Sequence, residues 1–296
     1  MRVQKLNRPG DVSDWVSAAA ALRRRVSDLF GAGPAEHVVL APGILIGLQV
    51  LLPGLGVRRI CLSDREYYGR AHFPAQEMCS PALEDLVECA AGARPDAVLA
   101  SLVTWRGEEI PIARLFRRIR AQCGRRAPLL IADCTHAGAV GFPELGKLGA
   151  DMVCGDTGKW ILPPGRESRI AFLWFRTEAL ARAARRAFEP FFLAAGSRDG
   201  FLYSRWLDPA EVLSVEDWYR RRRLGRPDLE RRQRANLRLA ARLAGRFGVT
   251  PAEGNSILRL AAGSPAVSLL AKLESLGLVW RLPDGTIRIQ CRADVR

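Results

Sequence analysis

Short apolar runs alternate with stretches of helical periodicity through the first two thirds of the chain. Uninterrupted apolar runs predict buried strands, because a strand covered on both faces shows no polar alternation. Predicted strands fall within 37–43, 58–64, 96–105, 128–135, 150–156 and 169–176. Predicted helices fall within 12–30, 44–55, 81–92, 112–124 and 142–149. The alternation predicts an α/β fold with a mostly parallel sheet and helices on both of its faces.

The pattern changes in the last third of the chain. Residues 187–215 interrupt the alternation and are rich in aromatic side chains. A predicted helix at 230–248, a strand at 255–262, a helix at 266–277 and a hairpin at 278–292 follow. We therefore expect three parts: an N-terminal arm or helix over 1–30, a large α/β domain over 31–215 and a small C-terminal α+β domain over 216–296.

The composition is that of an ordinary globular protein. With 296 residues, of which 48% are hydrophobic, the chain can bury a substantial core. No apolar run is long enough to span a bilayer, and the N-terminal segment lacks the charged-then-apolar order of a signal peptide. We expect a cytoplasmic protein without a membrane partner. The seven cysteines show neither a Cys-x-x-Cys pair nor metal-ligand spacing, so we expect small buried side chains and no metal site.

A net charge of +14 raises the possibility of a nucleic-acid partner. The arginines are spread along the predicted helices, however, and the densest run, at 218–234, also contains Asp228 and Glu230. The chain has no helix-turn-helix, zinc-finger or aromatic RNA-platform signature. A solvated, arginine-rich helical face is the better interpretation, and we expect no specific nucleic-acid partner.

One lysine stands out in the stretch "GADMVCGDTGKWILPPGRES" at 149–168. Only four of the 45 basic residues are lysines, and Lys159 lies between a Gly-containing turn and Pro-Pro-Gly. A phosphate-binding loop would need a glycine at Val153 and a hydroxyl at Trp160, so the P-loop pattern fails at both ends. The remaining chemistry for this lysine is a Schiff base with an aldehyde cofactor.

Other predicted strand ends carry the groups that pyridoxal phosphate requires. The cofactor needs a lysine, a carboxylate at its pyridine nitrogen, a flat group over its ring and donors for its phosphate. Asp133 ends one predicted strand and is followed by His136, while Tyr67 and Tyr68 follow another. The turn into the helix at 44–55 offers amides for an anion. These amides belong to Gly43, Ile44 and Leu45.

The stretch "IADCTHAGAVGFPELGKLGADMVCGDTGKWILPPG" resembles the core of the class V aminotransferase family of fold-type I pyridoxal-phosphate enzymes. It is most similar to the kynureninase, isopenicillin-N-epimerase-like and cysteine-desulfurase-like branch. The shared pattern is an aspartate, a histidine or glutamine three residues on, and later a lysine followed by an aromatic residue and a Pro/Gly turn. The similarity extends weakly over 14–292. It implies the fold-type I architecture and pyridoxal 5'-phosphate as cofactor.

The resemblance implies roles for the residues that match the family pattern. Lys159 would form the Schiff base and move protons, Asp133 would keep the pyridine nitrogen protonated, and His136 would flank the 3-hydroxyl or phosphate. Thr104 would lie beside the 3-hydroxyl and Tyr67 would stack on the ring.

Two further elements of the family concern the partner subunit and the substrate. The sequence "GSRD" at 196–199 resembles an element whose hydroxyl, here Ser197, reaches the phosphate of a neighbouring subunit, which implies a homodimer. The strand "DGTIRIQCR" resembles the one whose arginine holds the substrate α-carboxylate, with Arg288 as first choice and Arg292 as second.

The chain departs from the family around the lysine. Asp156 and Gly158 stand where the family commonly has phosphate-binding side chains, and a carboxylate repels a phosphate unless it is protonated or turned away. Thr157 is then the candidate hydroxyl for the phosphate. No cysteine lies between Cys154 and Cys291, which argues against a desulfurase with a mobile nucleophilic cysteine.

These observations favour a homodimeric pyridoxal-phosphate enzyme that acts on a small amino acid, in a specialised biosynthetic role. Aminotransfer, elimination and epimerisation share the same residues, so the sequence leaves the reaction open. The competing hypothesis is a degenerate homologue with a binding or assembly role and little catalysis.

Overall fold

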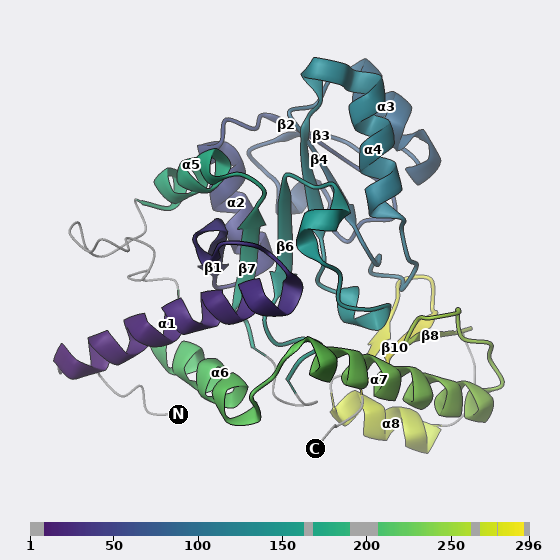
Figure 1. Ribbon diagram of the computed structural model, residues 1–296. Coiled ribbons are helices and arrows are strands. Elements are labelled where there is room, and N and C mark those ends of the chain that lie inside the picture. Colours follow the sequence, from purple (N-terminus) through teal and green to yellow (C-terminus); the bar gives the residue numbers. More distant parts are fainter. Residues whose placement is uncertain (1–8, 163–167, 190–206, 262–266, 277, 293–296) are drawn as a thin grey trace.

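The computed structural model describes residues 9–162, 168–189, 207–261, 267–276 and 278–292 (Figure 1). A central sheet carries helices on both faces, and a smaller sheet lies beside one of its ends. None of the helices in the described part of the chain combines the length and apolar character needed to cross a bilayer.

The central sheet has seven strands in the order β1-β7-β6-β5-β4-β2-β3. The strands are β1 Val38–Ala41, β2 Arg59–Leu62, β3 Glu77–Cys79, β4 Ala97–Ser101, β5 Leu129–Asp133, β6 Met152–Asp156 and β7 Ala171–Phe175. Only β7 runs against its two neighbours, so the sheet is mostly parallel, as predicted. The edge strand β3 was not predicted, because its three residues are not fully buried and form no apolar run.

The helices are α1 Pro9–Phe30, α2 Ile44–Gly54, α3 Leu86–Ala93, α4 Ile112–Cys123, α5 Glu178–Phe188, α6 Pro209–Arg222, α7 Arg226–Phe247 and α8 Val267–Ser275. Helices α2 and α5 pack on one face of the sheet, and α1, α3, α4 and α6 on the other. Successive strand residues alternate between the two cores: Val38 and Leu40 face α1, whereas Val39 and Ala41 face α2. The predicted helix at 142–149 is only a 3-10 turn, Leu145–Leu148.

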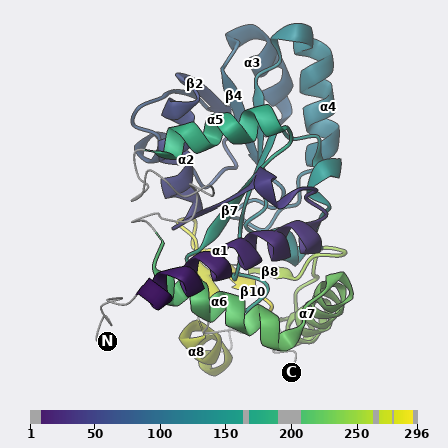
Figure 2. The same cartoon turned by 60° about the vertical axis from the view of Figure 1, so that its left-hand side comes forward.

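Helix α6 lies beside α1 and belongs to the core of the large unit (Figure 2). Its Tyr219 is fully buried and donates a hydrogen bond to the carbonyl of Thr157 at 2.6 Å. The expected domain boundary at 215/216 therefore falls inside a helix of the large unit. Helix α6 was not predicted, although its buried Val212, Val215 and Tyr219 follow helical spacing, because it begins inside 187–215, the stretch that interrupts the alternation.

The C-terminal unit contains an antiparallel sheet in the order β8-β10-β9, with α7 and α8 packed on it. The strands are β8 Ile257–Leu260, β9 Val279–Arg281 and β10 Ile287–Gln290, and the last two form the predicted hairpin. Several hydrogen bonds join this unit to the loops that follow β4 and β5. Among them, Asn255 Nδ2 donates to the carbonyl of Gly107 at 2.8 Å, and Ser256 N donates to that of Ala139 at 2.8 Å. The hairpin is thereby held beside the strand ends of the large sheet.

Candidate active site

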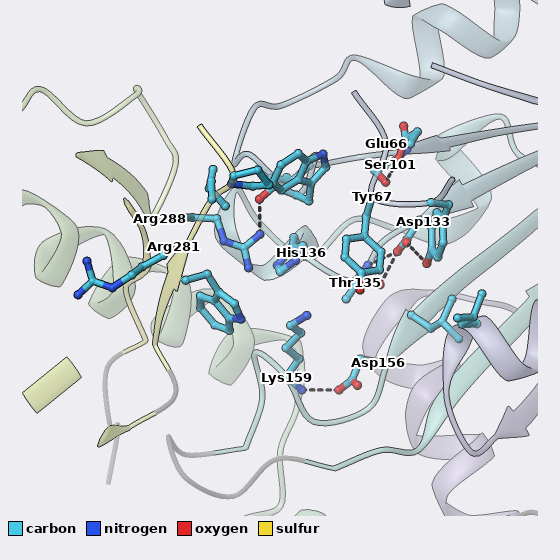
Figure 3. A pocket seen from close by; sticks show the side chains of 18 residues that line it. Glu66, Tyr67, Ser101, Asp133, Thr135, His136, Asp156, Lys159, Arg281 and Arg288 are labelled. Atoms are coloured by element: carbon cyan, nitrogen blue, oxygen red, sulfur yellow. Dashed lines mark hydrogen bonds between the residues drawn. The ribbon is translucent and has the colours of Figure 1, made fainter. Parts of the chain in front are cut away.

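A cavity of about 720 Å³ lies between the carboxyl ends of the central strands and the β9–β10 hairpin (Figure 3). Ser101, Asp133 and Asp156 are the last residues of β4, β5 and β6, and all three line the cavity. Parallel strands end at one edge of the sheet, which is where open α/β folds bind ligands. The hairpin closes the other side with Trp280 and Arg288.

Asp133 is anchored by neighbours that hold its carboxylate in place. The Tyr68 hydroxyl donates to Asp133 Oδ2 at 2.7 Å, and the Thr135 backbone N–H donates to Oδ1 at 2.7 Å. The Thr135 hydroxyl also donates to Oδ1. The side chain is 6% exposed, so the carboxylate is a preoriented acceptor at the floor of the cavity.

A second acid, Glu66, also lines the cavity, and the sequence pattern did not identify it. It accepts hydrogen bonds from the Ser101 backbone N–H, at 2.8 Å, and from the Ser101 hydroxyl. Burial raises the pKa of Glu66 to about 7, and the negative charge of Asp133 adds to this effect, while the bonds from Ser101 oppose it. Glu66 is therefore a proton-exchanging group near neutral pH. Its only sequence signal is its place just before Tyr67 after a predicted strand.

Lys159 extends from the turn after β6 into the cavity (Figure 3). Asp156 shapes this turn, because its Oδ1 accepts the backbone N–H of Gly158 at 2.6 Å and that of Lys159. The Asp156 carboxylate is thus engaged by its own turn, although it borders the cavity. A Cβ at Gly158 would lie 2.8 Å from side-chain atoms of Leu162 and Ser168, so the turn has no room for a larger residue there.

His136 lies against the ring of Trp160, with ring centroids 6.3 Å apart. Burial, together with the positive charges of Lys159 and Arg288, holds the pKa of His136 well below its usual value. The imidazole is neutral at physiological pH, and its buried Nδ1 has no hydrogen-bond partner among the described residues. This nitrogen is available to a ligand in the cavity.

Arg288 brings a buried positive charge to the cavity wall. Its Nη1 donates to the carbonyl of Trp105, and its Cζ lies 4.5 Å from the centroid of the Trp280 ring. Burial lowers the pKa of Arg288 to about 10, which still leaves the guanidinium charged at neutral pH. Arg292 does not line the cavity, and its Nη2 donates to the carbonyl of Leu162 at 2.6 Å. Arg288 and Arg292 are four residues apart, a separation of up to about 13 Å along an extended chain. Of the two, Arg288 lines the cavity.

The start of α2 borders the cavity opposite the hairpin. Ile44 and Leu45 line it, and Gly43 precedes them with φ +156°, a conformation that side chains disfavour. No side chain caps this helix start, so its first amides are open to an anion. Tyr67, 63% exposed, stands at the cavity mouth, where its ring can cover a flat ligand.

Thr104 and Thr157, like Gly43 and Arg292, are predicted site residues that do not line the cavity. The Thr104 hydroxyl accepts the Glu108 N–H at 3.2 Å within its own loop, while Val103 and Trp105 line the cavity instead. The Thr157 hydroxyl donates to the Ile170 carbonyl at 2.7 Å, although its neighbour Asp156 lines the cavity. In both cases the extended backbone alternates, so these fully buried threonines point to the opposite side. The predicted Ser197 lies outside the described residues.

The mostly parallel sheet with helices on both faces is a fold-type I architecture, which the chain shares with solved structures that are 13–16% identical to it. A cysteine desulfurase from Thermococcus onnurineus shares this fold with a TM-score of 0.66 and 14% identity, over 94% of this chain and 80% of that one. A mutant of C-DES with glycine covalently linked to its PLP cofactor matches with a TM-score of 0.69 and 16% identity, over 98% and 84%. The ureidoglycine-glyoxylate aminotransferase of Bacillus subtilis matches with a TM-score of 0.64 and 13% identity, over 95% and 84%.

The sequence comparisons found no counterpart. No family model matches the chain, and no curated protein matches it. The similarity to the solved structures therefore establishes the fold, and the residues of the site are the basis for proposing a function.

Proposed function

We propose that the protein is a pyridoxal-phosphate-dependent enzyme that acts on a small amino acid through Lys159. The observation that carries the proposal is one cavity that joins Lys159, Asp133 and Arg288 from three separate elements. A primary amine, a buried carboxylate and a carboxylate-binding guanidinium are the groups that this chemistry requires.

The residues of the cavity fit the cofactor. Asp133 keeps acceptor capacity on its oxygens beyond the bonds it already receives, so it can pair with a protonated ring nitrogen. The unpartnered Nδ1 of His136 and the uncapped start of α2 offer further polar contacts, the latter for a phosphate. Tyr67 would cover the ring from the mouth of the cavity.

Bound pyridoxal phosphate supplies an electron sink for negative charge at the carbon next to the amino group of the substrate. The chain supplies the rest. Lys159 holds the cofactor and accepts or returns the proton at that carbon, since its side chain enters the cavity beside His136 (Figure 3). Arg288 binds the substrate carboxylate and so fixes which bond faces the reacting centre. The walls formed by Trp105 and Trp280 reduce the access of water.

Aminotransfer and cleavage at the β-carbon are the reaction classes we favour, in a specialised biosynthetic role. The structures that share the fold include an aminotransferase and the cystine C-S lyase C-DES. No described residue that lines the cavity is a cysteine, and Cys291 is 1% exposed in the small unit. Persulfide formation on a protein cysteine, the desulfurase reaction, is therefore not part of the proposal.

Cofactor loading of the purified protein tests the proposal. Pyridoxal phosphate should produce a visible absorbance band, and borohydride should fix the cofactor on the peptide that contains Lys159. Lys159→Ala should abolish both signals. Lys147→Ala is the matched control, because Lys147 is 77% exposed and pairs with the surface residue Glu144.

The absence of the band and of the reduced adduct in a folded wild-type protein would refute the enzyme proposal. The chain would then be a degenerate homologue with a binding or assembly role. The proposal also includes a homodimer, which the resemblance of the 196–199 segment implied. Light scattering on the eluting protein tests it, and a strictly monomeric mass would contradict it.

A further inference from the structure

Three cysteines that are far apart in the sequence converge on the α3 side of the sheet. Cys61 belongs to β2, Cys79 ends β3 and Cys89 belongs to α3. Their sulfur atoms all lie within 4.8 Å of one another, and Cys61 Sγ and Cys89 Sγ are 3.7 Å apart. None of the three lines the active-site cavity. The sequence pattern predicted no metal site, because three different elements supply one thiol each.

The setting of the cluster combines a buried donor with two accessible ones. Cys61 is fully buried in the hydrophobic core, whereas Cys79 and Cys89 are half-buried and leave a path to solvent. Among the described residues, no histidine, aspartate or glutamate joins the group of three thiols. The donor set is therefore sulfur alone.

The spacing of the sulfurs suits a single metal ion. Two thiolates that each lie about 2.3 Å from one ion are roughly 3.8 to 4.0 Å apart at tetrahedral or trigonal angles. The Cys61 and Cys89 sulfur atoms are 3.7 Å apart, and all three sulfur atoms lie within 4.8 Å of one another. Side-chain shifts of only a few tenths of an ångström would bring the sulfur atoms to that geometry. We propose that Cys61, Cys79 and Cys89 form a binding site for a soft, thiophilic ion of the Cu⁺ class.

The number of donors selects among soft ions. Structural zinc takes four protein ligands, and the described residues provide three. Thiolates favour Cu⁺ among the biological metals, and three sulfurs give it a complete trigonal shell. A bound ion would tie the short edge strand β3 to β2 and α3, so it would stabilise this edge of the sheet.

Binding must displace protons from the thiols. Burial raises the pKa of Cys61, with contributions from Cys79 and Cys89, and burial also raises the pKa of Cys79. The metal-free thiols of Cys61 and Cys79 are therefore protonated at neutral pH, and binding of an ion releases protons. The apparent affinity should consequently increase with pH.

Titration of the reduced full-length protein with Cd²⁺ under anaerobic conditions tests the site. We expect thiolate-to-cadmium charge-transfer absorbance that saturates at one ion per chain, with proton release and an increase in thermal stability. Added Cu⁺ should displace Cd²⁺ at stoichiometric amounts, whereas Zn²⁺ should require an excess. Stoichiometric displacement by Zn²⁺ would overturn the assignment to a three-coordinate ion.

Variants of the two half-buried cysteines locate the site. Cys79→Ser and Cys89→Ser should each weaken Cd²⁺ binding by more than about a hundredfold, because the loss of a group that merely orients a ligand already costs about 10- to 100-fold. Cys123→Ser is the matched control, since Cys123 is also half-buried but lies at the end of α4, outside the cluster. Circular dichroism verifies that each variant is folded. A wild-type protein that shows no charge-transfer band, or folded Ser variants that keep it, would overturn the proposal.

Discussion

Replacement of Glu66 by glutamine should make the protein more stable at alkaline pH and leave it nearly unchanged in acid. The carboxyl of Glu66 is buried, and its pKa is raised to about 7 from 4.5, with burial as the largest cause. Glutamine has the same shape without the titratable proton. Its carbonyl oxygen can still accept the Ser101 N–H, and its amide group can donate to the Ser101 hydroxyl.

The sign and size of the effect follow from the two pKa values. Between pH 4.5 and about 7 the unfolded chain releases the Glu66 proton while the native state keeps it, so native stability falls as the pH rises through this window. Above pH 7 the native state has lost the full amount of stability that ionisation of Glu66 removes. The difference between the pKa of 4.5 in the unfolded chain and about 7 in the native state corresponds to about 3 kcal/mol of unfolding free energy. His136 acts in the opposite direction, because its depressed pKa makes stability fall as the pH drops through the ordinary histidine range. Subtraction of the wild-type curve from the variant curve cancels the histidine contribution.

Urea unfolding of the two proteins from about pH 5 to about pH 8 measures this difference. The advantage of Glu66→Gln should increase across the range toward about 3 kcal/mol. Glu77→Gln is the control, because its side chain is 70% exposed and pairs with Arg59 only at the surface. If the plots of unfolding free energy against pH were parallel for wild type and Glu66→Gln, the reasoning would be refuted. Glu66 would then have the same pKa in the folded and unfolded states.

Three further predictions concern the same region. Tyr68→Phe removes the hydrogen bond to the Asp133 carboxylate and should lower the unfolding free energy by about 2 kcal/mol in urea; an unchanged midpoint would contradict the anchoring role. Arg288→Lys keeps the positive charge but loses the planar guanidinium that can bind a carboxylate with two hydrogen bonds. In spectral titrations, the cofactor-loaded variant should bind amino acids about tenfold more weakly than wild type. Equal affinity would exclude Arg288 as the carboxylate ligand. Gly138→Ala places a Cβ 2.4 Å from the Trp160 side chain and should cost about 1 to 3 kcal/mol in thermal unfolding; a neutral result would show that Trp160 can move.

Much of the fold was predictable because each strand of a covered sheet is a short apolar run. The strands β1, β2, β4, β5, β6 and β7 lie inside the predicted ranges, and the C-terminal hairpin forms as expected. Strands that run in parallel end at one edge, so Asp133 and the turn of Lys159 were expected to meet, and both line the cavity. The edge strand β3 was missed because it has no apolar run, and the helix α6 because it begins inside the stretch 187–215 that interrupts the alternation.

Side-chain direction at the strand ends was not predictable to the same degree. A shift of one residue along an extended segment reverses the face, which is why Thr104 and Thr157 point away while Trp105 and Asp156 border the cavity. Which of Arg288 and Arg292 lines the cavity likewise depends on how the β9–β10 hairpin packs against the strand ends of the large sheet.

The sequence by itself determined the layered α/β architecture and the strand-end position of the lysine and the aspartate, because both follow from local periodicity and from chain direction. Only the tertiary structure decided which groups meet across elements. Glu66 lies in the turn after β2 and Ser101 ends the adjacent strand β4, while the three cysteines of the cluster come from two strands and a helix. Contacts between side chains of different elements depend on long-range packing, and burial and neighbouring charges then set the chemistry of each group. No pattern along a single segment of the sequence contains that information.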